Sequence, residues 1–367
     1  MSLPSVLVNL LWCVPGRVGG SEEYLVRQLL GLAELPEPRW HPTVAAARGL
    51  GAAHPELGAV SAVVEPDFES ANRLRRIVGE VTWLRRHTAE VALVHHGGGT
   101  APIGARRPYV LTIHDLQFRT FPQYFSRAKR AYLAALVPSS ARHAAMVAVP
   151  SEYVRDSVIR AYGIAAERVA VVPHGIEPGL VHAVTAAAEL RARYRLGDGP
   201  LIVYPAVTHP HKNHRFLLEM MRTHWTDPDL RLVLTGGEGL AESEVAATTD
   251  ERVRRVGRVS AADRNGLLAM ADAMVFPSQY EGFGAPLIEA MALGAPVVCG
   301  DATCMPQIVG TAGVVRPLSP DAWAGVLDEV RDRRDELVTA GLLRAEDFTS
   351  ATSGAALAGV YEKALAR

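Results

Sequence analysis

Short runs of apolar, largely β-branched residues alternate with helical patterns along the whole 367-residue chain. Such runs, bounded by turn-forming residues, are typical of strands that are buried on both faces of a sheet. In the first half we expect strands at Ser5–Trp12, Thr43–Ala46, Val91–His95, Tyr109–Ile113, Met146–Val149 and Val169–Val172. In the second half we expect them at Leu201–Tyr204, Leu230–Leu234, Val253–Val256, Ala273–Phe276, Pro296–Cys299 and Gly313–Val315. Amphipathic stretches such as 21–35, 127–136 and 215–222 separate these strands, so the pattern predicts an α/β protein with doubly wound parallel sheets.

The length of the chain suits two domains of roughly 170–190 residues each. A turn-forming cluster at 197–200, Gly-Asp-Gly-Pro, follows Ala-rich helical sequence and precedes a new buried strand. We therefore expect a first domain over 1–178, a linker over 179–199 and a second domain over 200–348. The remaining residues, 349–367, read as one helix.

Composition excludes several other classes of protein. Apolar residues make up 49% of the chain and charged residues 21%, which is ordinary for a globular protein and argues against disorder. The net charge of −1 provides no basic field for nucleic acid. The three cysteines fit buried thiols better than a disulfide framework. Neither a signal peptide nor a membrane-spanning stretch is evident, so the sequence predicts a cytoplasmic protein.

The segment 276–298 carries the strongest chemical pattern. A buried strand ends near Pro277, a glycine-bearing loop with Glu281 follows, and Pro286 occupies a position suited to the first turn of a helix. A helix that begins at the carboxyl edge of a strand presents unpaired N–H groups and a positive dipole end, which attract anions. Glu281 and Glu289 lie eight residues apart, so one carboxylate can face a sugar while the other accepts from ribose hydroxyls. The alternative is a βα unit with one capping and one solvated glutamate.

The sequence EGFGAPLIEAMALGAPVV resembles the E-x7-E signature of retaining glycosyltransferases of family 4, which have the GT-B fold. Other segments match that family in the same order: Gly19-Gly20, Thr112-Ile-His114-Asp115, Pro150-Ser-Glu-Tyr153, Val172-Pro-His174-Gly175, Pro210-His-Lys212-Asn213 and Leu234-Thr-Gly236-Gly237. The resemblance implies two Rossmann-like domains that face a cleft, with the C-terminal helix packing back on the first domain. It also implies that the second domain holds a nucleotide-sugar donor and the first domain the acceptor.

Lys212 is one of only three lysines among 38 basic residues. A lysine kept in an arginine-rich chain suits a point charge on a phosphate, although an ordinary surface lysine is the alternative. The resemblance implies that Lys212 neutralises the nucleotide diphosphate. Similar proteins often carry an arginine five residues earlier, where this chain has Val207. Other groups that can help Lys212 to neutralise the diphosphate are His209, His211, the Gly19-Gly20 amides and the helix end that follows Glu281.

The remaining site residues follow from position together with the resemblance. His114 ends an apolar strand, where open α/β sheets place their ligands, and we expect it to donate a hydrogen bond to the transferred sugar. Its alternative role is to cap the next segment. Gly236 and Gly237 lack the spacing of a dinucleotide fingerprint and are expected to shape the base or diphosphate pocket. The expected catalytic residues are His114, Glu281 and Lys212. The expected donor-binding residues are Gly19, Gly20, Lys212, Gly236, Gly237, Glu281, Gly282, Phe283, Gly284, Ala285 and Glu289.

The expected activity is the retaining transfer of a hexose to an acceptor hydroxyl, with formation of an α-glycosidic bond. The segments around Phe118, Phe121 and Pro210 are most similar to mannosyltransferases that use GDP-mannose. Two alternatives stay open: another hexosyltransferase that uses UDP-glucose or a related donor, and a non-catalytic nucleotide-sugar-binding protein. The acceptor is expected to be a carbohydrate, a lipid-linked molecule or a small molecule. We expect no cofactor and no metal, because fixed positive charges can meet the leaving diphosphate.

The stretch Arg73–Arg86 contains five arginines around apolar residues. A solvated basic helix face is the commoner explanation of such a pattern. The alternative is a peripheral contact with an anionic membrane surface, helped by Arg127, Lys129 and Arg130.

Overall fold

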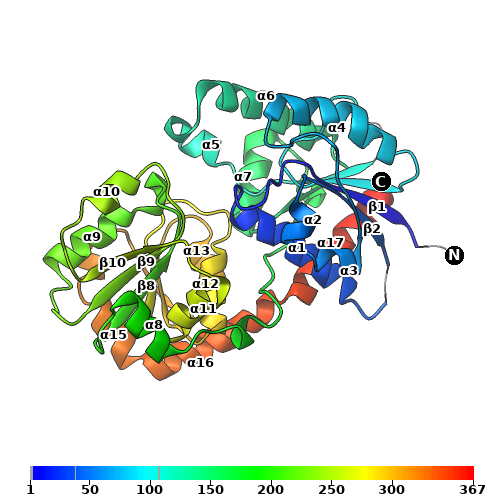
Figure 1. The fold of residues 1–367 in the computed structure, drawn as a ribbon. Helices are drawn as coiled ribbons and strands as arrows, with labels where there is room; N and C mark the ends of the chain where they lie inside the picture. Colours follow the sequence, from blue (N-terminus) through cyan, green and yellow to red (C-terminus); the bar gives the residue numbers. More distant parts are fainter. Residues whose placement is uncertain (1–2, 38, 106–107) are drawn as a thin grey trace. The chain divides into compact units, whose positions relative to one another are not determined.

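The computed structural model describes residues 3–37, 39–105 and 108–367, and it contains two wholly parallel β-sheets (Figure 1). Each sheet belongs to one unit of the chain. The first unit comprises Met1–Gly175 with Thr349–Arg367, and the second comprises Ile176–Phe348. The α/β class with two doubly wound sheets is therefore confirmed.

The first unit has seven strands in the order β3-β2-β1-β4-β5-β6-β7. They are β1 (Ser5–Leu10), β2 (His41–Ala46), β3 (Ala62–Val64), β4 (Leu93–His96), β5 (Tyr109–Thr112), β6 (Met146–Val149) and β7 (Val169–Val171). Its helices are α1 (Gly20–Ala33), α2 (Leu50–Ala53), α3 (Leu57–Val60), α4 (Arg73–His87), α5 (Gln117–Thr120), α6 (Arg127–His143), α7 (Glu152–Tyr162) and α17 (Ser350–Leu365). Short 3₁₀ turns are η1 (Pro122–Tyr124) and η2 (Ala166–Arg168).

Apolar side chains at successive positions of β1 point to opposite faces of this sheet. Val6 and Val8 pack in one core with residues of α1 and α17. Leu7 packs on the other side with Leu84 of α4. Because successive strand residues point to opposite faces, a continuous apolar run is what a sheet with helices on both sides requires.

The helices α1 and α17 touch at two glycines, although they come from opposite ends of the chain (Figure 1). A Cβ placed on Gly31 would lie 1.8 Å from the backbone oxygen of Ser350, and one on Gly354 would lie 2.1 Å from the carbonyl carbon of Gly31. Only glycine allows backbones to approach this closely. Farther along α17, the hydroxyl of Tyr361 lies 2.8 Å from Nδ1 of His95, which ties the helix to β4.

The second unit has six strands in the order β10-β9-β8-β11-β12-β13. They are β8 (Leu201–Pro205), β9 (Arg231–Thr235), β10 (Val253–Gly257), β11 (Ala273–Phe276), β12 (Val297–Gly300) and β13 (Val314–Arg316). Its helices are α8 (Ala187–Tyr194), α9 (His214–Thr223), α10 (Glu242–Ala246), α11 (Ala261–Ala269), α12 (Ala285–Ala292), α13 (Met305–Val309), α14 (Pro320–Trp323), α15 (Val326–Asp332) and α16 (Arg334–Ala345). Its 3₁₀ turns are η3 (Leu180–His182), η4 (Pro210–Lys212) and η5 (Glu346–Phe348).

Every expected strand is present, with ends that differ by at most a few residues. The sequence pattern missed β3, because three residues at the edge of a sheet are too few to show a period. It also ended one helix at Leu136, whereas α6 continues through Pro138 to His143. The segment expected as a linker, 179–199, contains η3 and α8 and is grouped with the second unit.

Candidate active site

The loop between β11 and α12 holds the densest group of expected site residues. Gly284 is the residue before the helix and has a left-handed backbone with φ of 86°. That conformation favours glycine. Pro286 lies in the first turn of α12, as expected, where a missing N–H costs no helical hydrogen bond. The ring of Phe283 packs edge-on against Phe348, with centroids 5.6 Å apart, and the residue is only 3% exposed. A ligand at this loop can therefore meet the backbone of Phe283 but not its ring.

Lys212 and Glu281 form an ion pair in which Nζ and Oε1 lie 2.6 Å apart. The two residues are 69 positions apart in the chain. The hydroxyl of Tyr204 donates to the carbonyl of Lys212 at 2.6 Å, and the amide of Gln279 donates to the carbonyl of His211 at 2.8 Å. The first bond ties η4 to β8, and the second ties it to the β11–α12 loop. The structure thus brings together two of the three expected catalytic residues, with side chains 19% and 11% exposed.

Thr303 lies in the loop that follows β12 and contacts the loop that carries Glu281. The amide of Glu281 donates to Oγ1 of Thr303 at 3.2 Å, and the thiol of Cys304 donates to the carbonyl of Glu281 at 3.4 Å. Thr303 has φ of 59°, a conformation that β-branched residues rarely adopt. Such backbone strain persists where the surroundings hold it, often at functional sites. No sequence motif marked Thr303, because its role depends on a contact between two loops.

We expect Thr303→Val to lower the rate of sugar transfer about tenfold, because the amide of Glu281 loses its acceptor and the carboxylate its fixed position. Thr303→Ser keeps the hydroxyl and is the matched control. Steady-state kinetics of both variants test this expectation. Equal rates for Val and Ser would show that the hydroxyl does not position Glu281.

Glu289 lies on α12 and is 5% exposed. Its Oε2 lies 3.9 Å from Nη1 of Arg264, on α11. A buried carboxylate needs such a partner, because desolvation without one is costly. Arg264 is thus a second residue that sequence reasoning missed. Glu281 precedes the helix and Glu289 lies within it, and their roles on the sugar and the ribose stay predictions.

A steric contact within the chain, without any ligand, explains why residue 236 is glycine. A Cβ on Gly236 would lie 2.4 Å from the backbone oxygen of Ala206, and its amide donates to the carbonyl of Gly257 at 2.8 Å. Its glycine identity follows from the close approach of two strand ends. A Cβ on Gly237 would lie 3.3 Å from Nη2 of Arg258 and 3.9 Å from Cγ2 of Val207. A guanidinium therefore lies beside Gly237, close to the position where the family's arginine is replaced by Val207.

His114 lies in the first unit, between the rings of Trp12 and Tyr24. Its Nε2 lies 2.8 Å from the carbonyl oxygen of Gly97, and since a carbonyl only accepts, Nε2 carries the proton. Burial lowers the pKa of His114 to about 4, so the ring is neutral at pH 7 and Nδ1 is an acceptor. Because Nε2 is engaged by the carbonyl of Gly97, the ring nitrogen left for a ligand is Nδ1, which is an acceptor and not the donor that was expected.

Gly19 and Gly20 open α1 in the first unit, and both are exposed. Gly19 has φ of 61°, and a Cβ on either glycine would meet no heavy atom within 4 Å. No side chain caps this 14-residue helix at Gly19. The space beside these two glycines is therefore open, and the contact of their amides with an anion or an acceptor stays a prediction. Of the expected site residues, Gly19, Gly20 and His114 belong to the first unit, and the others to the second.

The neighbouring histidines of β4, His95 and His96, lie in the interior. Each is at most 2% exposed, and burial lowers the pKa of each to about 3. Their ordinary pKa in an unfolded chain is near 6.5, so below pH 6.5 the unfolded state binds protons that the folded state excludes. Stability must therefore fall as pH decreases from 6.5 toward 4.

We expect acidification from pH 6.5 to pH 5 to lower the free energy of unfolding by about 2 kcal/mol for each such histidine. Denaturant titrations at several pH values measure this slope. His95→Gln should flatten the slope, whereas His143→Gln on the exposed end of α6 should leave it unchanged. An unchanged slope in His95→Gln would contradict the assignment of a neutral, buried ring.

Comparisons with known proteins agree with this geometry. The family model described as Glycosyltransferase Family 4 matches residues 18–180, and the one described as Glycosyl transferases group 1 matches residues 199–332. These two matches cover most of both units. The chain belongs to the family 4 glycosyltransferases.

Several curated relatives are mannosyltransferases. O-antigen chain mannosyltransferase B of Escherichia coli is 30% identical over 252 residues, which are 65% of this chain and 66% of that protein. The MMP alpha-(1->4)-mannosyltransferase of Mycolicibacterium hassiacum is 28% identical over 229 residues, or 58% of this chain and 52% of that protein. The matched region thus spans just under two thirds of the first relative and about half of the second.

Solved structures match over nearly the whole chain. Sucrose-phosphate synthase from Thermosynechococcus elongatus has a TM-score of 0.76 at 19% identity, with 100% of both chains covered. Anabaena HepE in complex with UDP and glucose has a TM-score of 0.75 at 19% identity, with 98% of this chain and 99% of that chain covered. These likenesses confirm the expected GT-B fold.

Proposed function

We propose that this chain is a retaining hexosyltransferase that transfers mannose from GDP-mannose to an acceptor hydroxyl. The observation that carries the proposal is the Lys212–Glu281 pair, which lies where β8 and β11 end. Carboxyl ends of parallel strands are the usual ligand-binding edge of open α/β sheets. The names of the mannosyltransferase relatives support mannose as the sugar.

The proposed chemistry depends on how the site treats the leaving diphosphate. In the structure Glu281 is the ion-pair partner of Lys212. A diphosphate replaces Glu281 at Lys212, and the freed carboxylate then accepts from the hydroxyls of the sugar. Negative charge that develops on the diphosphate is met by Lys212 and the amino end of α12. Because these charges are fixed in place, we propose that transfer needs no metal and no cofactor.

Arg258 supplies a second positive charge in this proposal. It lies beside Gly237, and Val207 leaves the family's arginine position uncharged. Both Gly237 and η4 follow strand ends at the same edge of the sheet. A guanidinium binds phosphate oxygens in a bidentate fashion, which a lysine cannot do. Arg258 thus compensates for Val207.

The test begins with thermal shifts of the full chain in GDP, UDP, ADP and dTDP, each with and without Mg²⁺. A ligand that binds the native state raises its melting temperature by mass action. We expect GDP to give the largest shift, equally with and without Mg²⁺, and GDP-mannose to yield an α-linked product when acceptors are supplied. The anomeric configuration is read by NMR. A shift only with UDP would favour UDP-glucose as donor, and no shift with any nucleotide would contradict the proposal.

We further propose that the first unit contacts an anionic membrane surface through α4. Leu74 is 76% exposed and Val78 60% exposed on this arginine-rich helix. Arg73 stacks on the ring of Tyr132 at 3.9 Å, so α4 and α6 present their basic residues together. No helix among the described residues is long and apolar enough to span a membrane. Co-sedimentation with phosphatidylglycerol vesicles should be lost in Leu74→Glu; binding equal to wild type would contradict the contact.

A further inference from the structure

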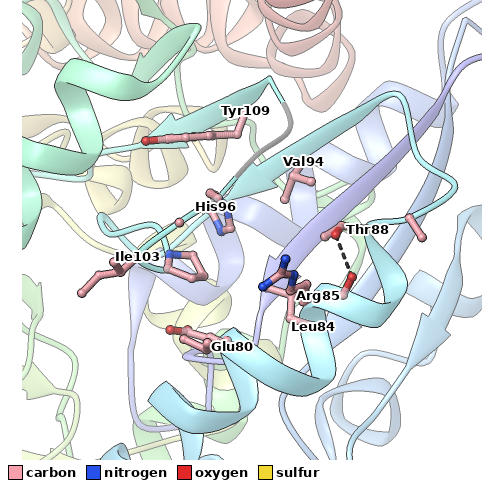
Figure 2. Close-up of a pocket in the computed structure, with 13 residues that line it drawn as sticks. Glu80, Leu84, Arg85, Thr88, Val94, His96, Ile103 and Tyr109 are labelled. Atoms are coloured by element: carbon pink, nitrogen blue, oxygen red, sulfur yellow. Dashed lines mark hydrogen bonds between the residues drawn. The ribbon is translucent and has the colours of Figure 1, made fainter.

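A pocket of about 260 Å³ lies in the first unit, beneath the connection from β4 to β5. These strands are parallel neighbours, and such neighbours are usually joined by a helix that covers the sheet. Here the described part of the connection, 97–105 and 108, contains no helix. Beside α4, the described part of this connection lies on the sheet as a loop, and the pocket lies there (Figure 2).

The walls of the pocket are mainly apolar. They include Val81 and Leu84 of α4, Val94 of β4 and Ile103 of the loop. The ring of Tyr109 forms another wall, and its hydroxyl is already engaged because it donates to the carbonyl of Ser140 at 2.8 Å. Val81 and Ile103 are 42% and 81% exposed, which makes the mouth of the pocket apolar as well.

One hydrogen-bond donor that lines this pocket has no acceptor among the described residues. The amide of Leu11 donates to Oδ1 of Asn9 at 3.1 Å, which fixes the orientation of the Asn9 side chain. Its Nδ2 lies 3.2 Å from Nδ1 of His96 and therefore donates to it. The neutral ring of His96 carries its proton on Nε2, for which the described residues supply no hydrogen-bond partner. His96 is 2% exposed and lines the pocket.

A buried acceptor lines the same pocket. Figure 2 shows His96 with the ring of Tyr109 on one side and Glu80 on the other. The Glu80 side chain is 12% exposed, and its Oε1 lies 4.0 Å from Nε of Arg76. The Asn9 side chain is a second hydrogen-bonding neighbour of Glu80, and burial raises the pKa of this carboxyl group. A carboxyl group has more hydrogen-bonding positions than these two neighbours use.

The polar part of the pocket thus includes the N–H donor of His96 and the carboxyl group of Glu80. Arg85 and Thr88 also line the pocket, and the hydroxyl of Thr88 already donates to the carbonyl of Arg85.

We propose that this pocket binds a small uncharged molecule that carries a hydroxyl group on an apolar body. A hydroxyl can accept from Nε2 of His96 and can donate to Glu80, so its chemistry matches either group. An anionic group beside His96 would meet the carboxyl group of Glu80, and benzoate tests whether Arg85, which also lines the pocket, offsets this repulsion. A cationic ligand cannot accept from His96, whose donor then remains unpaired at a cost. The volume suits a single ring or a short chain, below the size of most drug-like ligands.

Four probes of nearly equal shape separate these possibilities: benzyl alcohol, toluene, benzoate and benzylamine. Binding to the full chain is measured by saturation-transfer NMR and titration. We expect benzyl alcohol to bind in the millimolar range and at least fivefold more tightly than the other three. Equal affinity for benzyl alcohol and toluene would overturn the proposal. It would also be overturned if the alcohol did not bind at about 20 mM, which is near the weakest affinity expected for so few atoms.

Two substitutions on α4 localise the site. Val81→Trp fills the pocket from a partly exposed wall and should weaken benzyl alcohol binding at least tenfold. Val78→Trp adds the same ring to the same helix at a residue that does not line the pocket, and should leave binding unchanged. His96→Phe should abolish the preference for the alcohol over toluene. Unchanged binding in Val81→Trp would place the ligand elsewhere and refute the site.

Discussion

Lys212→Ala should lower kcat/KM for the nucleotide-sugar donor by about a hundredfold or more, because the leaving diphosphate loses its fixed positive charge. The same change should weaken GDP binding. The chain should stay folded with a lower melting temperature, because the Glu281 side chain, which is 11% exposed, loses its ion-pair partner. Isothermal titration with GDP and steady-state kinetics measure the two effects. Lys129→Ala, a lysine in the first unit, is the matched control. Wild-type GDP affinity in Lys212→Ala would remove Lys212 from the site.

Replacement of Glu281, the other member of the ion pair, should have the opposite effect on GDP binding. Glu281→Gln removes the carboxylate that competes with the diphosphate for Lys212, so GDP should bind more tightly while sugar transfer slows. Arg258→Ala should weaken GDP binding about tenfold, less than Lys212→Ala, because Arg258 is the more exposed of the two charges. Weaker GDP binding in Glu281→Gln would contradict the exchange of partners at Lys212.

Gly31→Ala should destabilise the first unit by about 3 kcal/mol or more, since the added Cβ would lie 1.8 Å from the backbone of Ser350 and must push α17 away from α1. Backbone atoms cannot rotate aside as a side chain does. Gly359→Ala on α17 is the matched control, because a Cβ there meets nothing within 4 Å and alanine favours the helix. Denaturant unfolding of both variants measures the difference. Equal stability of the two variants would show that the helices can separate at no cost.

Local pattern was sufficient for most of the secondary structure. The apolar runs that become β1 and β11 are long enough to show that they are buried, and turn residues bound them. The edge strand β3 was missed because three partly exposed residues carry no pattern that distinguishes them from a loop. The helix α6 was predicted too short because Pro138 ordinarily ends a helix, whereas here the chain continues to His143.

The site residues also divide into those that local sequence predicts and those that it does not. Glu281, Glu289 and the glycines between them could be predicted because their spacing within one loop and helix is local. Thr303, Arg264 and Arg258 could not, because each acts on a site residue from a different element. The protonation of His114 also depends on a distant group, the carbonyl of Gly97.

The sequence by itself determined the α/β class, the order of strands and helices, the family and the loop that carries Glu281 and Glu289. These follow from periodicity and from motifs within a few tens of residues, where chain connectivity fixes neighbours. Only the tertiary structure decided that Lys212 pairs with Glu281, that His114 presents Nδ1 as an acceptor, and that α1 and α17 meet at glycines. Each of these depends on atoms that come within about 3 Å after distant segments pack, and hydrogen bonds and steric contacts act only at such range.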